Sequence, residues 1–209
     1  MITPDFSYEK TLLKGGLQVI AGVDEAGTGA LAGPVVAAAA IVPINSRLGL
    51  LRDSKLLSPA QRERAFFLFA KKEIVFSLGV VEIEEINRMN IRQAAILAMR
   101  RAVLSLPNSP DALLIDAWTI PGLALKQIAV VHGDQLVKSI AAASIAAKVT
   151  RDRMMQTLDQ EFPEYGFSIN KGYGTAKHLE ALREFGPTTA HRLAFRPVQK
   201  CLTSRPFKD

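Results

Sequence analysis

Residues 22–35 read Gly-Val-Asp-Glu-Ala-Gly-Thr-Gly-Ala-Leu-Ala-Gly-Pro-Val, and they join two apolar runs of the chain. The runs, residues 17–23 and 35–42, are short, rich in β-branched residues and bounded by Gly and Pro, which is typical of strands buried on both faces. Asp24 and Glu25 stand side by side where the first run passes into a glycine-rich turn. The segment therefore predicts two buried strands with a pair of carboxylates at the end of the first.

The rest of the chain alternates further strands with helices. Ser58 followed by Pro59 is typical of a helix start, and alanines in the centre of the longest helical pattern predict close packing on a sheet. We expect strands at residues 74–83, 111–117 and 125–131, and helices at residues 61–72, 90–106 and 135–158. This order predicts one α/β domain over residues 1–209, with a core at 17–160 and a C-terminal extension of short helices and loops at 161–209.

Composition and charge limit the class of protein. Of the 209 residues, 48% are hydrophobic and 22% are charged, which is typical of a globular chain and excludes a disordered one. The 26 Lys and Arg exceed the 20 Asp and Glu, and the net charge of +6 favours a polyanionic partner such as nucleic acid. Cys201 is the only cysteine, which excludes an internal disulfide.

The apolar stretches of the chain do not suggest a secretory signal or a membrane span. Residues 1–14 lack a charged region followed by a long apolar run. Residues 30–44 are interrupted by Gly33, Pro34 and Pro43 and fall short of the roughly 20 residues that a bilayer demands. We therefore expect a soluble, cytoplasmic protein that has no membrane partner, with a monomer as the default state.

Two further acids follow predicted strands. Asp116 closes one strand, and Asp134 follows another and opens the long helix. Taken singly, an acid next to glycine is common in turns, Asp116 could face water, and Asp134 could cap its helix for about 1 kcal/mol. Taken together with Asp24 and Glu25, neighbouring strands would bring four carboxylates into a small volume, which is self-repelling unless cations occupy it.

The type of ligand indicates which cation such a cluster would hold. Carboxylate oxygens favour Mg²⁺ or Mn²⁺ over zinc, and His132, His178 and His191 show no ligand spacing. Two such ions about 4 Å apart can activate a water and stabilise the oxygen that leaves a phosphodiester. The acids and the positive net charge together therefore predict a metal-dependent nuclease.

Basic residues near the acids are candidates for phosphate contacts. On one continuous helix, Lys138 and Lys148 would project within about 40° of Asp134. Solvated helix lysines are the ordinary alternative, and Arg151 and Asp152 fit an ordinary ion pair at the helix end.

Six blocks in order along the chain resemble ribonuclease HII. They are residues 22–35, Asp53-Ser-Lys-Leu-Leu-Ser58, Leu114-Ile-Asp-Ala117, His132-Gly-Asp134, residues 143–152 and residues 171–178. The resemblance implies a ribonuclease H-like fold, with a five-stranded mixed β-sheet flanked by helices. It also implies an endonuclease of DNA replication and repair. Such an enzyme hydrolyses the RNA strand of RNA–DNA hybrids and cuts 5′ to single ribonucleotides in duplex DNA, which leaves 5′-phosphate and 3′-hydroxyl ends.

The resemblance also implies roles for the acids. Asp24, Glu25, Asp116 and Asp134 match the four catalytic and metal-binding acids of the family. The first three match the direct ligands of the divalent metal, Mg²⁺ or Mn²⁺.

Further residues match the family's substrate-binding groups. Main-chain groups of Gly27, Thr28 and Gly29, together with Tyr173, correspond to those that recognise the ribose 2′-hydroxyl beside the cut. Thr28 replaces the family's arginine, so a guanidinium contact to phosphate is lost, and Ala30 replaces a frequent proline. The remaining candidates for substrate contacts are Lys55, Ser144 and Lys148.

Two alternatives remain open. A catalytically weakened protein that binds hybrids fits Thr28, but a pure binder of polyanions gains nothing from clustered acids. A ribonuclease HIII-like enzyme usually carries an extra N-terminal domain, for which the short segment before Asp24 leaves no room. The sequence decides neither whether a replication clamp is a partner nor what the basic and aromatic tail around Arg192 does.

Overall fold

A five-stranded mixed sheet forms the centre of the protein, whose computed structural model describes residues 3–44, 46 and 57–204. The strands are β1 (Ile20–Ala26), β2 (Val35–Ile41), β3 (Val75–Val81), β4 (Ala112–Asp116) and β5 (Lys126–Val130). Their order is β3-β2-β1-β4-β5, with antiparallel pairing from β3 to β1 and parallel pairing from β1 to β5. The mixed sheet confirms the prediction from the sequence.

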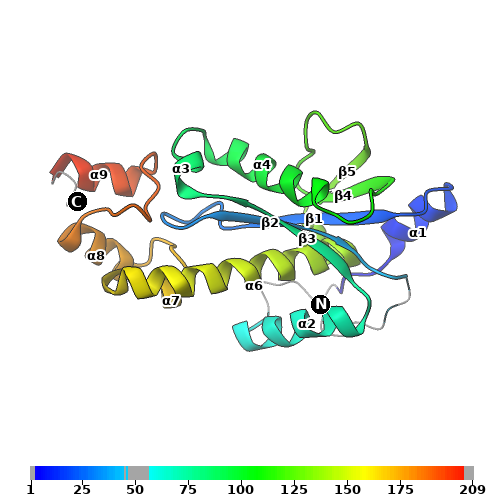
Figure 1. Ribbon diagram of the computed structural model, residues 1–209, viewed down its shortest axis with the longest axis horizontal. Helices are drawn as coiled ribbons and strands as arrows, with labels where there is room; N and C mark the ends of the chain where they lie inside the picture. Colours follow the sequence, from blue (N-terminus) through cyan, green and yellow to red (C-terminus); the bar gives the residue numbers. More distant parts are fainter. Residues whose placement is uncertain (1–2, 45, 47–56, 205–209) are drawn as a thin grey trace.

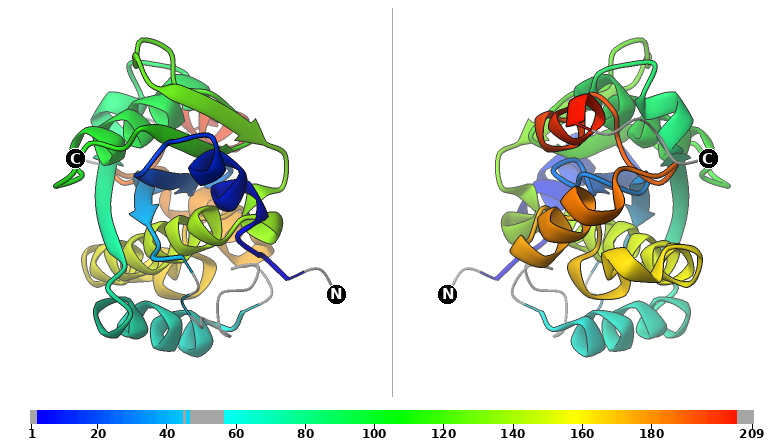
Figure 2. Two further views of the ribbon diagram at one scale, coloured as in Figure 1. Left: turned by 90° about the vertical axis from the view of Figure 1, so that its right-hand side faces the viewer. Right: turned by 90° about the vertical axis from the view of Figure 1, so that its left-hand side faces the viewer.

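Helices cover both faces of the sheet (Figure 1, Figure 2). α4 (Ile91–Leu104) packs on the face that contains Val23, and α6 (Lys138–Glu161) packs on the face that contains Gly22. The backbones approach closely, because a Cβ atom on Gly22 would lie 2.1 Å from the main-chain carbonyl carbon of Ser139. The buried alanines of α6 permit the same approach, which confirms the predicted close packing of this helix on the sheet.

The remaining helices lie around this core. Ser58 caps α2 by accepting a hydrogen bond from Gln61, as the sequence predicts. α1 lies at one end of the molecule, and α8 and α9 lie at the other (Figure 1). The last segments share a small core of their own, which also includes Leu31 from the loop after β1. The elements are α1 (Ser7–Lys14), α2 (Pro59–Lys71), α3 (Ile83–Ile86), α5 (Gly133–Leu136), the 3₁₀ helix η1 (Pro163–Tyr165), α7 (Phe167–Asn170), α8 (Ala176–Phe185) and α9 (Arg196–Ser204).

Two predictions about local structure are wrong. β1 continues to Ala26 instead of ending at Val23, because β2 keeps pairing with it beyond the last residue that pairs with β4. The predicted helix at residues 135–158 is two helices, α5 and α6, separated by the extended residue Val137. The N-terminal segment causes the break, since Asp5 accepts a hydrogen bond from the Lys138 N–H and donates one to the Leu136 carbonyl.

Within the part of the chain that the structure describes, no helix combines the length and the apolar character needed to cross a bilayer.

Candidate active site

The acids of β1 and β4 meet at one edge of the sheet, where the parallel pairing of these two strands ends. Val23 lies opposite Ile115, so the following residues, Asp24 and Asp116, are neighbours. Side chains alternate along a strand, and both of these aspartates therefore project on the face that α6 covers. Glu25 leaves β1 on the opposite face, at the same edge.

Asp134 approaches this edge from α5. It lies in the first turn of that helix and is 1% exposed. The adjacent Gly133 N–H donates a hydrogen bond of 2.7 Å to Asp116 Oδ1, which fastens α5 to the end of β4. His132, just before it, adopts a left-handed conformation with φ of 56°, which turns the chain sharply from β5 into α5. A strand end and a short helix thus bring Asp134 behind the other acids.

Asp24 is the electrostatic centre of the group. Burial raises the pKa of Asp24 well above its usual value, the charges of Glu25 and Asp116 raise it further, and Asp134 adds to the effect. A hydrogen bond from Ser144 lowers the same pKa. All three of the other acids therefore act on Asp24, and their mutual repulsion is relieved by binding either a proton or a cation.

A pocket of about 220 Å³ opens beside these acids. Asp24, Glu25 and Asp116 line it together with residues from the glycine-rich loop, from α6 and from the segment before α8. The other lining residues are Ala26, Gly27, Thr28, Ser144, Lys148 and Tyr173. The structure thus gathers most of the candidates from the sequence into one cavity.

Two of the other candidates lie outside this lining. Asp134 is buried behind the pocket, outside its lining. Gly29 is exposed at the rim, where an added Cβ atom would lie 3.8 Å from Tyr173 Cε1. Lys55 lies outside the described residues.

The two lysines predicted to share a helix face have different surroundings. Lys148 lines the pocket, lies 5.8 Å from the centre of the Tyr173 ring and forms a 3.0 Å ion pair with Asp152. Lys138 instead interacts with acids of the N-terminal segment, since burial lowers the pKa of Lys138 while Asp5 and Glu9 raise it. The prediction for Lys138 is wrong because the break at Val137 interrupts the helical periodicity on which it rested.

The donor set fits a hard divalent cation. Within the described part of the chain, no three His, Cys, Asp or Glu side chains already form a coordination sphere. The pocket lining nevertheless supplies carboxylate oxygens, which are the ligands that Mg²⁺ and Mn²⁺ prefer. The lining contains neither His nor Cys, which disfavours zinc. The raised pKa of Asp24 shows why a cation would be stabilised there.

A family profile described as Ribonuclease HII matches residues 21–198, which include all of these pocket residues. The chain belongs to the ribonuclease HII family. A relative named Ribonuclease HII from Chloroflexus aggregans is 50% identical over 206 residues, 96% of this chain and 97% of that protein. The ribonuclease HIII alternative is not favoured, because the profile and the relatives are those of ribonuclease HII.

Solved structures confirm the ribonuclease H-like fold. The ribonuclease H2 from Pyrococcus horikoshii matches with a TM-score of 0.75 at 26% identity, covering 90% of this chain and 98% of that one. The ribonuclease HII in a PCNA complex from Archaeoglobus fulgidus matches with a TM-score of 0.74 at 25% identity, covering 86% and 96%.

Two buried arginines hold the main chain around the pocket of this family member, and sequence reasoning missed both. Arg151 does not form the ordinary ion pair with Asp152 that the sequence also allowed, since that carboxylate binds Lys148 and Arg62. Arg151 instead donates hydrogen bonds to main-chain carbonyls. The sequence does contain a signal for Arg151, because residues 144, 148 and 151 are spaced to lie on one face of a helix. Arg192 has no such signal, because its partners lie 158 to 165 residues away along the chain.

Two buried histidines, His178 and His191, form a chain of hydrogen bonds that reaches the main-chain carbonyl of Tyr173. The Thr188 N–H donates to His191 Nδ1 at 3.0 Å, and His178 Nδ1 lies 2.9 Å from the Tyr173 carbonyl oxygen. These partners assign His178 Nδ1 as a donor and His178 Nε2 as the acceptor of the 3.1 Å hydrogen bond from His191 Nε2. Both imidazoles are therefore neutral, in agreement with burial lowering the pKa of each.

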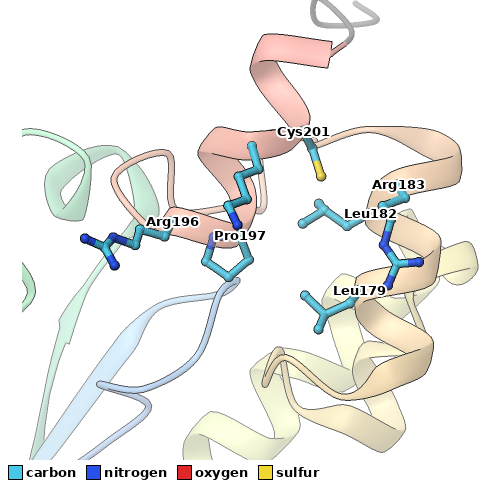
Figure 3. A pocket seen from close by; sticks show the side chains of 7 residues that line it. Leu179, Leu182, Arg183, Arg196, Pro197 and Cys201 are labelled. Carbon is cyan, nitrogen blue, oxygen red and sulfur yellow. The ribbon is translucent and has the colours of Figure 1, made fainter.

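A larger pocket of about 480 Å³ lies between α8 and α9 (Figure 3). Leu182 and Cys201 face each other across it, and Arg183 and Arg196 lie at its sides. The residues that line it include no carboxylate, in contrast to the pocket beside Asp24.

Proposed function

We propose that this ribonuclease HII family member hydrolyses the RNA strand of RNA–DNA hybrids and cuts duplex DNA 5′ to single ribonucleotides, leaving 5′-phosphate and 3′-hydroxyl ends. The observation that carries the proposal is the pocket in which Asp24, Glu25 and Asp116 meet the glycine-rich loop and Tyr173. It combines acids for a metal with groups placed for a sugar and a phosphate.

Asp24, Glu25 and Asp116 are the residues that would hold the divalent metal, Mg²⁺ or Mn²⁺, on which this family depends. Such ions, when bound, supply Lewis acidity that activates water and stabilises the leaving oxygen. Asp134 acts on Asp24 from behind and adds negative charge that favours a cation in the pocket. The Gly133 N–H fixes one oxygen of Asp116, so the carboxylate keeps its orientation.

The sugar and phosphates of the substrate would meet the other side of the pocket. Gly29 leaves the main chain of the loop open to close approach, since no atom lies closer than 3.8 Å to the Cβ atom that it lacks, and Tyr173 is 37% exposed. Lys148 adds a positive charge whose position the Asp152 ion pair fixes. These groups fit a ribose next to a phosphodiester.

A replication clamp is a further expected partner of this chain. The support is the fold shared with the Archaeoglobus fulgidus protein, which was solved in a complex with PCNA. Binding of the purified chain to a sliding clamp, measured by size-exclusion chromatography, tests this expectation.

Product mapping tests the proposed activity. The substrates are a duplex with one ribonucleotide and an RNA–DNA hybrid, each incubated with Mg²⁺ or Mn²⁺ and, separately, with a chelator. We expect metal-dependent cuts, with the single-ribonucleotide duplex opened on the 5′ side of the ribose. Binding to both substrates without any metal-dependent cut would favour the alternative of a hybrid-binding protein.

A further inference from the structure

Arg192 lies beneath the loop of residues 27–34 and is fully buried. It donates six hydrogen bonds of 2.7 to 3.3 Å to carbonyl oxygens of this loop. The acceptors belong to Gly27, Thr28, Ala30, Gly33 and Pro34. One guanidinium therefore fixes the direction of most peptide groups in the loop that forms a wall of the pocket.

The direction of a carbonyl determines the direction of the next amide. In a planar trans peptide the C=O and N–H bonds point to opposite sides, and the described chain contains no cis peptide. Because Arg192 Nη1 binds the carbonyls of Gly27 and Thr28, the N–H groups of Thr28 and Gly29 point away from it. Among the described residues the structure records no acceptor for these two N–H groups.

Arg151 joins this loop to the segment that carries Tyr173. Its guanidinium donates to the carbonyls of Ala32 and Pro34 on one side and to that of Lys171 on the other, at 2.9 to 3.1 Å. A Cβ atom on Gly27 would lie 2.0 Å from Arg151 Nε, so the approach requires glycine there. The loop and the tyrosine therefore form one unit on a common buried support.

Two buried guanidinium groups side by side are costly, because each loses its hydration and they repel each other. Burial, with Arg151 next in effect, lowers the pKa of Arg192 to about 9, which leaves it protonated at neutral pH. Apolar side chains would fill this space without that cost. Only a planar group with several N–H donors satisfies so many carbonyls at once.

We infer that Arg192, with Arg151, is a positioning residue for ribose recognition: it turns the carbonyls of the loop inward and thereby presents the N–H groups of Thr28 and Gly29 to the ribose 2′-oxygen. This inference rests on the proposed function. It also accounts for the tolerance of threonine at position 28, since the contact is made by the main chain.

Paired binding measurements test the inference. The background is Asp116→Asn, which blocks cleavage, with Mg²⁺ present. The two probes are identical DNA duplexes that differ by one 2′-hydroxyl. Two hydrogen bonds of ordinary strength predict that the background binds the ribonucleotide duplex about tenfold more tightly. Adding Arg192→Lys keeps the charge but replaces the planar fork of five N–H donors with three donors on a single nitrogen, which cannot reach all the carbonyls. We expect the affinity ratio to fall to about one, with the affinity for all-DNA duplex unchanged.

Arg101→Lys is the matched control, because Arg101 makes a bidentate contact to Glu85 and a bond to the Val80 carbonyl, away from the loop. It should keep the tenfold ratio. A tenfold ratio in Arg192→Lys would overturn the inference, since a purely structural arginine would weaken both affinities or neither. A background protein that binds both duplexes equally would overturn the proposed ribose recognition itself.

A measurement without any change to Arg192 covers the case in which Arg192→Lys does not fold. In the Asp116→Asn protein, the amide resonances of Thr28 and Gly29 should shift with the ribonucleotide duplex and stay in place with the all-DNA duplex. Resonances that respond equally to both duplexes would contradict the inference.

Discussion

Thr28 lines the pocket and is half-buried, and it occupies the position where the family resemblance implies arginine. Restoring the arginine should add a guanidinium contact to a substrate phosphate. We predict that Thr28→Arg lowers the KM for a duplex with one ribonucleotide by about threefold to tenfold, with kcat nearly unchanged. Steady-state cleavage kinetics at fixed salt measure both constants.

Thr28→Ala is the control for this change, because it removes the side chain and keeps the main chain. It should cleave as the unaltered protein does. A loss of more than about threefold in kcat/KM would show that the threonine hydroxyl takes part in binding.

His191 makes the stability of the fold depend on pH. Burial, with the adjacent His178 next in effect, lowers the pKa of His191 to about 3 from the ordinary value of 6.5. Between these values the unfolded chain takes up a proton that the folded chain does not. The free energy of unfolding therefore falls as the pH drops from 6.5 toward 3, by up to about 1.4 kcal/mol per pH unit for this proton.

Chemical denaturation between pH 7 and 5 measures this dependence. His191→Gln should be less steeply pH-dependent, by about one proton at the lower end of the range. His132→Gln is the matched control, because His132 is exposed, and it should keep the steepness of the unaltered protein. Equal slopes in all three proteins would contradict the assignment of a neutral, buried His191.

The residues of the site differ in how far the sequence could predict them. Asp24 and Asp116 follow apolar runs, and neighbouring parallel strands end at the same edge of a sheet, so their proximity could be predicted. The bonds of Arg192 depend on a loop more than 150 residues away, which no local pattern shows. The His178–His191 pair likewise appears only after α8 and the following loop have packed.

At the scale of the elements, the contact between β1 and α6 places Asp24 within hydrogen-bonding distance of Ser144. Gly22 makes it possible, because an added Cβ atom would lie 2.1 to 2.4 Å from the main chain of Ser139 and Ile140. Because the atoms that would overlap belong to the main chain of both elements, no side-chain movement can relieve the overlap. We predict that Gly22→Ala lowers the free energy of unfolding by about 3 kcal/mol, as overpacking does.

Urea unfolding measures this change. Gly29→Ala is the control, because nothing lies closer than 3.8 Å to the Cβ atom it would gain. It should change stability by less than about 0.5 kcal/mol. A Gly22→Ala protein as stable as this control would contradict the close packing of α6 on β1.

From the sequence, the positions of helices and strands can be predicted better than the breaks within them. The strand at residues 35–42 and the capped helix after Ser58 have clear local signals, and both are present. The break at Val137 has no glycine or proline to mark it. It arises because Asp5 takes over the hydrogen bonds of the neighbouring residues, and this contact spans more than 130 positions of the chain.

At the scale of the whole molecule, mutual repulsion within the acid cluster opposes the stability of the fold, and the proposed cation would relieve it. A ligand at about 100 times its Kd stabilises a folded protein by about 2.7 kcal/mol. We predict that Mn²⁺ at such a concentration raises the Tm by about 5–10 °C. Asp24→Asn should melt no lower than the unaltered protein without metal, because a repelled charge is gone, and should gain less than about 2 °C with Mn²⁺. Calorimetry that shows the full gain in Asp24→Asn would remove Asp24 from the metal site.

The most direct measurement compares Asp116→Asn with Asp111→Asn in the cleavage of a duplex that contains one ribonucleotide, with Mg²⁺ or Mn²⁺. Asp116 is the last residue of β4, whereas Asp111 precedes the first, where it accepts hydrogen bonds from the N–H groups of Gln18 and Val19. Changes that only touch the partners of metal ligands cost 10- to 100-fold, so loss of a ligand should cost at least about a hundredfold. We expect Asp116→Asn to lose at least this much activity and Asp111→Asn to stay within about twofold of the unaltered protein. Cleavage by Asp116→Asn at the rate of Asp111→Asn would contradict an active site at the meeting ends of β1 and β4.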